Sequence, residues 1–403
     1  RKSSMEVTIP SVFLCPISLD LMKDPVTLST GITYDRESID KWIQSGHSTC
    51  PVSNQPLSNS DQIPNHFIRR MIQSWCVDNR SNGVERIPTP RAPITSFEVN
   101  QICSRLAKAV DVGNKHRCFE LLRKLKNLAN ESDKNMKCIA ESDAVEALSS
   151  AFEWFSEEGD SAVMEELLSI LVWMKKPDKA NKIGSLVSVR GIQTVMKSGA
   201  TSSRNDAVLV LRNIVTAIES APNALIETRG MLESLVSVLK AETPNAITNA
   251  TLTILSRILL QNGGVSSSLV QMGVVEILVR NILAGDKTTG KRALIVLDNV
   301  CECAMGREKA YESNLLVHTL VTKVGASADA SADASVSVLW KLWKGRRGIV
   351  KEMVEMKLFE KLLMTLQMGC LEDTKQKAKD LLRAMNAHSR RLNMDFRYLK
   401  VPN

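Results

Sequence analysis

Two short segments near the N-terminus place cysteine in the setting of a metal site but lack the partners that a metal needs. Cys15 and Cys50 each begin the pattern Cys-Pro-x-Ser. A structural zinc ion takes four Cys or His ligands, usually supplied in close pairs such as Cys-x2-Cys. Ser18 and Ser53 stand where the second cysteine of each pair would be. We therefore predict two metal-free loops, with no bound metal ion and no cofactor.

The rest of the chain carries no pattern for covalent catalysis. The five histidines never pair at ligand spacing, and neither a Ser-His-Asp signature nor a glycine-rich phosphate loop is present. Nine scattered cysteines, an odd number, argue against a disulfide framework. Cys301 and Cys303 would not share a helix face, so we interpret them as thiols of a core or its flank. No catalytic nucleophile is predicted.

The elements around the two loops are those of a small α+β domain, which we place at residues 8–80. Residues 26–28 and 32–34 are β-prone runs separated by Ser-Thr-Gly, which predicts a hairpin. Asp35 is a good N-cap for a helix over about 36–45. Pro64 and Asn65 open a second amphipathic helix, which should pack over the loops or against a second copy of the chain.

The segment from residue 13 to residue 76 resembles the U-box, a zinc-free relative of the RING domain. The resemblance rests on Phe13-Leu14-Cys15-Pro16-Ile17-Ser18-Leu19, Lys23-Asp24-Pro25-Val26, Gly31-Ile32-Thr33-Tyr34-Asp35-Arg36, Cys50-Pro51-Val52-Ser53 and Ile63-Pro64-Asn65. It implies that hydrogen bonds and salt bridges hold the two loops. The candidates for this network are Cys15, Ser18, Asp20, Asp24, Asp35, Arg36, Cys50, Ser53 and Asn65. An unrelated α+β domain with two stray cysteines is the alternative.

A proline-rich spacer at residues 81–96 separates this domain from a long helical region. Pro88, Pro90 and Pro93 forbid a regular helix there. Beyond it, two ladders of apolar pairs repeat every 40 to 47 residues. One ladder is Leu125/Leu128, Leu171/Met174, Leu211/Ile214, Leu255/Ile258, Leu297/Val300, Leu339/Leu342 and Leu382/Met385. The other is Val145/Leu148, Ile192/Val195, Leu232/Leu235, Val275/Leu278, Val317/Leu320 and Phe359/Leu362.

This period is that of armadillo and HEAT repeats. Gly191 and Gly273, each before an apolar helix, look like the armadillo turn. The pattern predicts a right-handed α-solenoid of six to seven repeats over residues 97–391, followed by a basic tail at 392–403. Its concave surface is the expected substrate site, and the groove candidates are Asn127, Trp173, Asn213, Arg257, Asn299 and Lys341. Only three of these six are the asparagine that armadillo repeats place in the groove.

Two stretches interrupt the ladder. Residues 325–335 repeat Ser-Ala-Asp and are interpreted as a mobile loop leading into a helix near Ser335 or Val336. Trp340 and Trp343 then share a helix face beside Arg346 and Arg347. They could be core residues or a stacking surface for a partner, and we favour the core for at least one of them.

The net charge and the hydropathy pattern limit which partners and which location can be expected. The net charge is +8, and residues 375–400 hold eight Lys or Arg against two acidic residues. Such a face is usually solvated, but it could contact acidic proteins or an anionic membrane. Nucleic acid is not expected, because no interleaved aromatic residues accompany the charge. No run of 18 apolar residues and no signal pattern is present, so a cytoplasmic location is expected, with peripheral membrane association or nuclear shuttling left open.

A U-box followed by a proline-rich spacer and armadillo repeats resembles the plant U-box E3 ubiquitin ligases, in particular the stress- and immunity-associated subgroup. The resemblance implies an enzyme that docks a ubiquitin-charged E2 and a protein substrate, without a covalent intermediate and with a homodimer through the U-box left open. The residues that match the E2-contact surface are Ile17, Leu19, Trp42, Pro51 and Val52. Asn54 stands where strongly activating members have a basic side chain. The alternatives are a non-catalytic armadillo adaptor and a phosphoinositide-binding scaffold.

Overall fold

The chain forms two compact units that divide between Pro93 and Ile94. The computed structural model describes residues 8–57, 62–80, 84, 94–142, 144–173, 181–241, 243–325 and 330–391. Most of the spacer predicted at 81–96 and all of the tail at 392–403 lie outside these ranges. Each unit has its own hydrophobic cluster of buried residues. Each is thus a folded body with a separate interior.

The N-terminal unit is built on a small antiparallel sheet in the order β2-β1-β3. Its elements are η1 (Ser11–Phe13), β1 (Pro25–Thr27), β2 (Thr33–Asp35), α1 (Arg36–Gln44), β3 (Ile63–Pro64) and α2 (His66–Asp78). Val26 of β1 lies opposite Tyr34 of β2 and Pro64 of β3. The predicted hairpin and the two predicted helices are therefore confirmed.

Aromatic and aliphatic side chains from η1, β1, β2, α1 and α2 fill the interior of this unit. Tyr34, Ile39 and Ile72 are fully buried and come from β2, α1 and α2. Phe13 and Trp75 pack edge to face with ring centroids 6.1 Å apart, which ties η1 to α2. Both cysteines of the Cys-Pro-x-Ser segments lie inside the same cluster.

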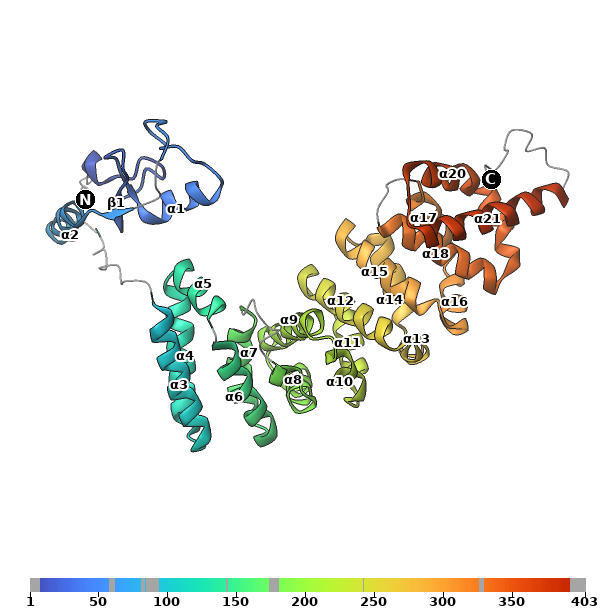
Figure 1. Ribbon diagram of the computed structural model, residues 1–403, viewed down its shortest axis with the longest axis horizontal. Coiled ribbons are helices and arrows are strands. Elements are labelled where there is room, and N and C mark those ends of the chain that lie inside the picture. The colour runs from blue at the N-terminus through green and yellow to red at the C-terminus, as the bar shows by residue number, and fades with distance from the viewer. Residues whose placement is uncertain are drawn as a thin grey trace, which may run out of the picture. The chain divides into compact units, whose positions relative to one another are not determined.

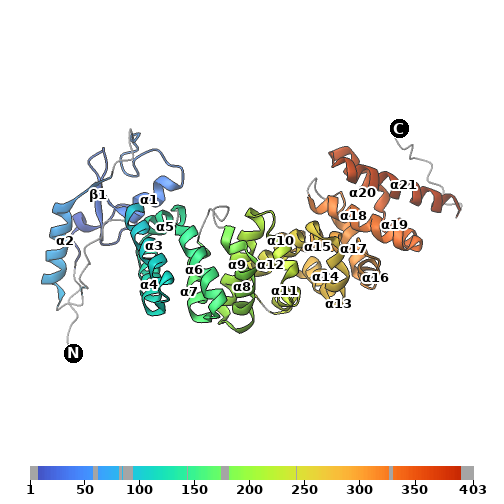
Figure 2. The same cartoon turned by 60° about the horizontal axis from the view of Figure 1, so that its bottom comes forward.

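The second unit consists of helices in repeated groups (Figures 1 and 2). In chain order the groups are α3 (Ser96–Asp111) and α4 (Lys115–Glu131); α5 (Asp133–Glu141), α6 (Ala144–Glu158) and α7 (Ser161–Leu171); η4 (Asn181–Gly184), α8 (Leu186–Ser198) and α9 (Thr201–Ala217); α10 (Ala221–Glu227), α11 (Met231–Lys240) and α12 (Asn245–Gln261); η5 (Gly263–Val265), α13 (Ser266–Gln271), α14 (Val274–Ala284) and α15 (Lys287–Val300); α16 (Ala304–Tyr311), α17 (Asn314–Lys323) and α18 (Ala330–Gly345); and η6 (Arg347–Ile349), α19 (Val350–Glu355), α20 (Leu358–Met368) and α21 (Glu372–Arg391).

Met174 of the first ladder lies outside the described residues. The other apolar pairs lie on the last helix of every group, which we call its third helix, and on the helix before it from the second group onward. The leading residues of the first ladder are all buried, and they lie on α4, α7, α9, α12, α15, α18 and α21. Each of these third helices packs against the third helix of the next group, as α12 does against α9 and α15. One hydrophobic cluster therefore runs through the whole stack.

Gly191 and Gly273 were both predicted to be turns before an apolar helix, but they have different structural roles. Gly273 has a φ of 79° and precedes α14, where left-handed backbone favours glycine. Gly191, predicted to be a turn of the same kind, instead lies inside α8. A Cβ at Gly191 would lie 2.1 Å from Ser156 Oγ and 2.7 Å from Ser156 Cβ. This glycine allows α8 to approach α6 closely, so the prediction of a turn at Gly191 was wrong.

The helix predicted near Ser335 begins earlier, at Ala330. Alanine has the highest helix propensity, and small residues allow close packing. Ala332, Ala334 and Ser335 are buried, so the repeated Ser-Ala-Asp sequence forms the first turns of α18 rather than a loop. Residues 326–329 of the predicted loop lie outside the described residues.

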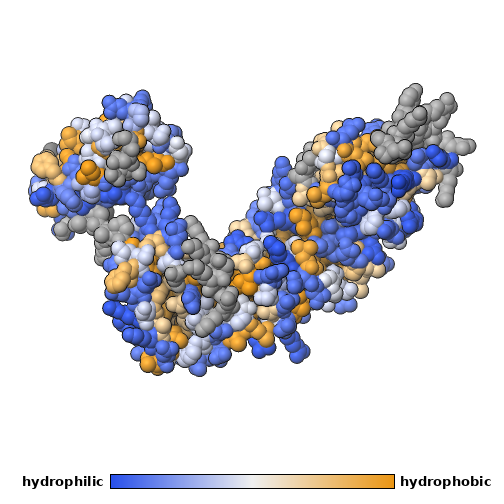
Figure 3. Space-filling model, in the orientation of Figure 1, coloured by the Kyte–Doolittle hydropathy of each residue, from blue (hydrophilic) through white to orange (hydrophobic). Residues whose placement is uncertain are grey.

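Polar residues cover most of the visible face of the repeat unit, with small apolar patches between them (Figure 3). Within the described ranges no single helix is long and apolar enough to cross a membrane. One pair, 263–271 and 274–284, meets that test only when its two helices are taken together, and they are bent by 87°.

Candidate functional site

The first Cys-Pro-x-Ser segment forms a tight loop at residues 14–21, which we call loop 1. Cys15 N donates a hydrogen bond to Asp20 O at 2.8 Å, and Leu19 N donates to Cys15 O at 2.8 Å. An antiparallel bridge between Leu14 and Leu21 closes the loop. Leu19 has a φ of 60°, an uncommon value for a residue other than glycine. The loop is therefore closed by its own backbone.

The second segment, loop 2 (residues 49–56), repeats this geometry. Cys50 N donates to Gln55 O, and Asn54 N donates to Cys50 O, both at 2.9 Å. A bridge joins Thr49 to Pro56, and Asn54 has a φ of 55°. Every one of these features has its counterpart at the same position in loop 1. The chain thus builds one loop twice, each starting from a buried cysteine.

The two cysteine sulfurs are hydrogen-bond acceptors inside the fold. Cys15 Sγ accepts from Asp35 N at 3.3 Å. Cys50 Sγ lies 3.0 Å from the Tyr34 hydroxyl and accepts from the Thr30 hydroxyl at 3.4 Å. Across the described ranges, no three His, Cys, Asp or Glu side chains are arranged to hold a metal ion. Hydrogen bonds to the two sulfurs therefore tie both loops to neighbouring parts of the unit.

The surroundings of Cys50 favour its thiolate. Burial alone opposes ionisation, but hydrogen bonds from Ser53, Thr30 and Tyr34 outweigh it and lower the pKa of Cys50 to about 6 from its ordinary value of 9.0. Burial and the neighbouring Cys50 raise the pKa of Tyr34, so the phenol stays protonated and donates. Hydrogen bonds from loop 1 and from Asp35 also lower the pKa of Cys15, against the effect of burial.

This shift predicts a pH dependence for the N-terminal unit. Because the pKa of Cys50 is lower in the folded state, the unfolded state binds more protons between about pH 6 and 9. The free energy of unfolding should therefore rise from pH 6 to pH 9. The stabilisation contributed by the Cys50 thiolate is lost as the pH falls from 9 through 6. Pulse proteolysis in urea at several pH values measures this, with cleavage of the N-terminal unit followed on gels. Cys50→Ser should flatten the rise, and an equally steep rise in that variant would contradict the assignment.

An ion-pair network centred on Asp24, which lies between loop 1 and β1, links both helices of the unit. Asp24 accepts from Arg36 Nε at 2.6 Å and from Arg69 Nη2 at 2.5 Å. Asp35 Oδ1 accepts the backbone N–H groups of Lys23 and Asp24 at 2.7 and 2.8 Å. Asp24, Arg36 and Asp35 are therefore in the predicted network. Arg69 was not predicted, because it follows Asp24 by 45 residues and nothing local marks the pairing.

The remaining predicted network residues act more locally. Asn65 Oδ1 caps α2 by accepting from Ile68 N at 3.0 Å, and its amide nitrogen donates to the hydroxyls of Thr27 and Thr33. Ser53 is a hydrogen-bond partner of Cys50. Ser18 Oγ accepts from Asp20 N at 3.4 Å, a long contact, and Asp20 contributes its carbonyl to loop 1.

Trp42 fastens α1 to loop 2 and remains partly accessible. Its indole Nε1 donates to Thr49 O at 2.9 Å. The His47 ring stacks on the indole with centroids 3.9 Å apart and an interplanar angle of 17°. His47 Nδ1 also lies 3.1 Å from Trp42 O. These contacts hold the indole in one orientation, and no sequence pattern had indicated His47.

The other predicted docking residues lie on the two loops. Leu19 is 72% exposed and Val52 is 54% exposed, whereas Ile17 and Pro51 are half-buried. Loop 1 is joined to the start of α1 through Cys15 and Asp35, and loop 2 to its end through Trp42 and Thr49. The two loops therefore flank α1, and each presents an exposed aliphatic side chain.

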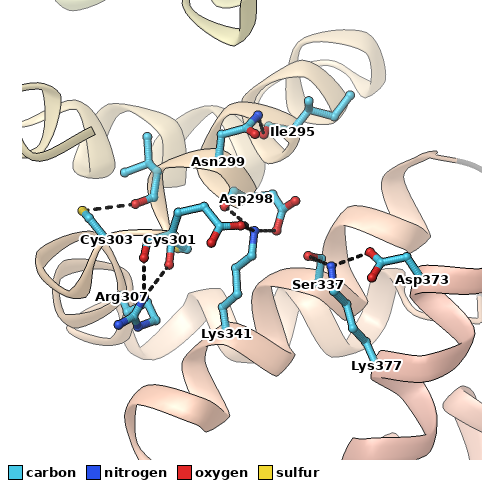
Figure 4. Close-up of polar contacts among 12 residues, drawn as sticks. Ile295, Asp298, Asn299, Cys301, Cys303, Arg307, Ser337, Lys341, Asp373 and Lys377 are labelled. Carbon is cyan, nitrogen blue, oxygen red and sulfur yellow. Dashed lines mark hydrogen bonds and ion pairs between the residues drawn. The ribbon is translucent and has the colours of Figure 1, made fainter. Parts of the chain in front are cut away.

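Five of the six predicted groove residues lie on the third helices of the repeats, and Trp173 lies two residues after the end of α7. Asn127 and Arg257 are exposed, and Trp173, Asn213 and Asn299 are half-buried. Asn213 Oδ1 accepts from the Arg212 guanidinium. Asn299 Nδ2 donates to Ile295 O (Figure 4), so both amides are engaged locally.

Lys341 differs from the prediction, because its ammonium group is buried. Its side chain is 7% exposed and points from α18 toward Asp298 on α15 (Figure 4). Lys341 Nζ donates to Asp298 Oδ1 at 2.8 Å and to Glu302 Oε1 at 2.7 Å. Burial would lower the pKa of Lys341, but these two carboxylates raise it above the ordinary value. Lys341 joins two consecutive repeats rather than lining an open groove.

A two-loop domain built without zinc ligands, followed by stacked helical repeats, defines the class of U-box proteins with armadillo repeats. Residues 9–81 match the U-box domain family model, and residues 98–396 match the model described as the plant U-box protein ARM repeat region. The chain belongs to the plant U-box E3 ubiquitin ligases with armadillo repeats.

Curated relatives match over almost their whole length. U-box domain-containing protein 21 of Arabidopsis thaliana is 38% identical, covering 98% of this chain and 94% of the relative. E3 ubiquitin-protein ligase PUB23 of the same plant is 32% identical, covering 94% and 93%. An engineered protein of known structure is 19% identical with a TM-score of 0.52, covering 72% of this chain and 71% of its own. That last likeness supports the fold alone.

Proposed function

We propose that Ile17, Leu19, Trp42, Pro51 and Val52 form the docking surface for a ubiquitin-charged E2. The single observation that carries this is the orientation of Trp42, held between α1 and loop 2 with exposed Leu19 and Val52 on the flanking loops. Aromatic and aliphatic anchors rimmed by polar residues are typical of transient interfaces. Docking holds the E2 thioester near a substrate lysine, and transfer gains from proximity.

The surface of the armadillo repeats is proposed to select the protein substrate. Exposed Asn127 and Arg257 support this, because they lie on third helices at separate points of the stack, and half-buried Trp173 lies two residues after the end of α7. A reaction with E1, E2, ubiquitin and ATP tests the whole proposal. The full chain should form ubiquitin chains on itself, whereas a correctly folded chain that forms none would favour the non-catalytic adaptor.

Asn54, an uncharged residue, is proposed to limit the rate at which this protein stimulates discharge of charged E2. It occupies the left-handed position of loop 2 and is exposed, so its side chain is free to be replaced without loss of packing. A cation at this position could bridge E2 and ubiquitin, whereas an amide brings no charge. Asn54→Arg should therefore raise the rate at which charged E2 discharges onto free lysine severalfold. Asn54→Gln is the neutral control of greater length, and an equal rise in both variants would remove the argument from charge.

A U-box-mediated homodimer is proposed from the exposed apolar side chains of β3 and α2. Ile63 is 65% exposed, Phe67 is 68% exposed and Met71 is 40% exposed. Phe67 and Met71 share a helix face, which could pack against the same face of a second copy. Light scattering should find a dimer that Phe67→Glu converts to a monomer. A monomeric parent chain would contradict the proposal.

We further propose a role in plant stress or immune signalling within a reducing compartment such as the cytoplasm. All nine cysteines are free thiols, which supports the compartment. Membrane contact through the basic C-terminus has weaker support, because Lys375, Lys377 and Arg383 of α21 pair with acidic neighbours. Co-sedimentation with anionic vesicles at low and high salt tests that contact.

A further inference from the structure

Four cation–π contacts occur together between the sixth and seventh repeats. Lys344 Nζ lies 3.7 Å and Lys377 Nζ 5.5 Å from the ring centroid of Trp340. The guanidinium of Arg347 lies 4.1 Å from the ring of Trp343. That of Arg346 lies 4.2 Å from the ring of Tyr311, on α16. We define Tyr311, Trp340, Trp343, Lys344, Arg346 and Arg347 as the basic–aromatic patch.

The rings of this patch serve two purposes. All three are partly buried and pack against the hydrophobic core of the repeats. Trp340 Nε1 donates to Asp380 at 3.1 Å, and the Tyr311 hydroxyl donates to Glu352 at 2.7 Å, so both rings are also fixed by hydrogen bonds. The prediction that at least one tryptophan belongs to the core is confirmed, and both rings also stack with cations of the same chain. A fixed ring holds the cation above it in place.

Neighbouring basic residues are neutralised, but those of the patch are not. Lys341 is paired with Asp298 and Glu302, and Lys377 with Asp373 (Figure 4). Within the described part of the chain, Lys344, Arg346 and Arg347 have no ion-pair partner, and all three are exposed. The carboxyl end of α18 carries about half a negative charge at most. A local excess of positive charge therefore remains.

The geometry of the arginines suits a carboxylate ligand. A guanidinium that stacks on a ring through its face keeps its N–H edge free, and this edge matches a carboxylate bidentately. Because the rings already restrict these long side chains, a ligand loses less conformational entropy on binding. The aromatic rings lie beneath the cations and do not protrude, which disfavours insertion into a bilayer.

We propose that the basic–aromatic patch binds an acidic, Asp- and Glu-rich segment of a partner protein. This goes beyond the ligase function, because binding here requires neither E2 nor ubiquitin. The complementary charge and the two stacked arginines identify the chemistry of the occupant. A membrane surface is the competing outcome of the test.

The test measures binding of the purified full chain to a fluorescent Asp/Glu-rich peptide by anisotropy, with an Asn/Gln peptide of the same length for comparison. The acidic peptide should bind the parent, and the amide peptide should not. R346Q/R347Q should raise the Kd about tenfold or more. R346K/R347K keeps the positive charge but loses the guanidinium groups that can bind a carboxylate bidentately, so it should raise the Kd about threefold.

R105Q/R280Q is the matched control. Arg105 on α3 and Arg280 on α14 are exposed, and the described contacts include no ion pair for either. This control removes the same charge and should leave the Kd of the acidic peptide unchanged. Equal weakening in both double variants would show that only net charge matters, and it would overturn the proposal. So would a parent chain that binds neither peptide, or one that binds only phosphatidylserine vesicles and not the acidic peptide.

Discussion

Trp42→Ala should lower the rate of ubiquitin transfer at limiting E2 by about 30-fold or more while leaving the chain folded. The indole is the aromatic anchor of the proposed E2 surface, and truncating such an anchor typically costs 2 kcal/mol or more of binding, which is about 30-fold in affinity. The side chain is only half-buried, so its removal opens no large cavity in the core. Discharge of charged E2 onto free lysine measures the effect, and thermal unfolding checks the fold.

Two further variants separate docking from local structure. Trp42→Phe keeps an apolar ring but loses the 2.9 Å bond from Nε1 to Thr49 O, so it should retain intermediate activity. Val77→Ala removes another exposed aliphatic group of the same unit, 56% exposed on α2, and should retain full activity. If Trp42→Ala discharged E2 at the parent rate, the proposed docking surface would be wrong.

Asp24→Asn should unfold or strongly destabilise the U-box without touching the docking surface. The substitution leaves the Arg36 and Arg69 side chains, 25% and 14% exposed, without their carboxylate. Breaking a buried ion pair on one side typically costs about 3 kcal/mol, because an uncompensated charge stays in the fold. Pulse proteolysis of the N-terminal unit gives the change in free energy, and E2 discharge should fall in parallel.

Glu37→Gln is the control for this prediction. The Lys41–Glu37 pair has the same 2.6 Å separation as the Arg36–Asp24 pair, but its side chains are 69% and 73% exposed. Water and salt screen such a pair, so its loss should cost less than about 0.5 kcal/mol. Equal destabilisation by the two substitutions would show that burial does not decide the strength of these pairs.

The period of the repeats and the secondary structure of the U-box could be predicted because both depend on patterns of residues close together in the sequence. The described apolar pairs of the ladders fall on the last two helices of the groups. Asp35 and Asn65 both precede the helices that they were expected to start, but only Asn65 caps its helix with a side-chain hydrogen bond. The turn at Gly191 was wrong because glycine also permits close helix packing, and only the neighbouring Ser156 distinguishes the two roles.

Contacts between distant residues were beyond the reach of the sequence pattern. Arg69 pairs with a carboxylate 45 residues earlier, and Lys341 with one 43 residues earlier. The type of a side chain at a repeat position did not reveal whether it would face solvent or a charge on the next repeat. His47 was missed for the same reason, since its role is to stack on the Trp42 ring, a contact that only the structure shows.

The pairing of Asp24 with both Arg36 and Arg69 also sets an order for biosynthesis. Loop 1, loop 2 and the sheet leave the ribosome before the arginine that completes the network, which lies on α2. Until that helix emerges, Asp24 can form only one of its two ion pairs. The ion-pair network that joins the two helices of the nascent U-box is therefore complete only after its second helix has been synthesised.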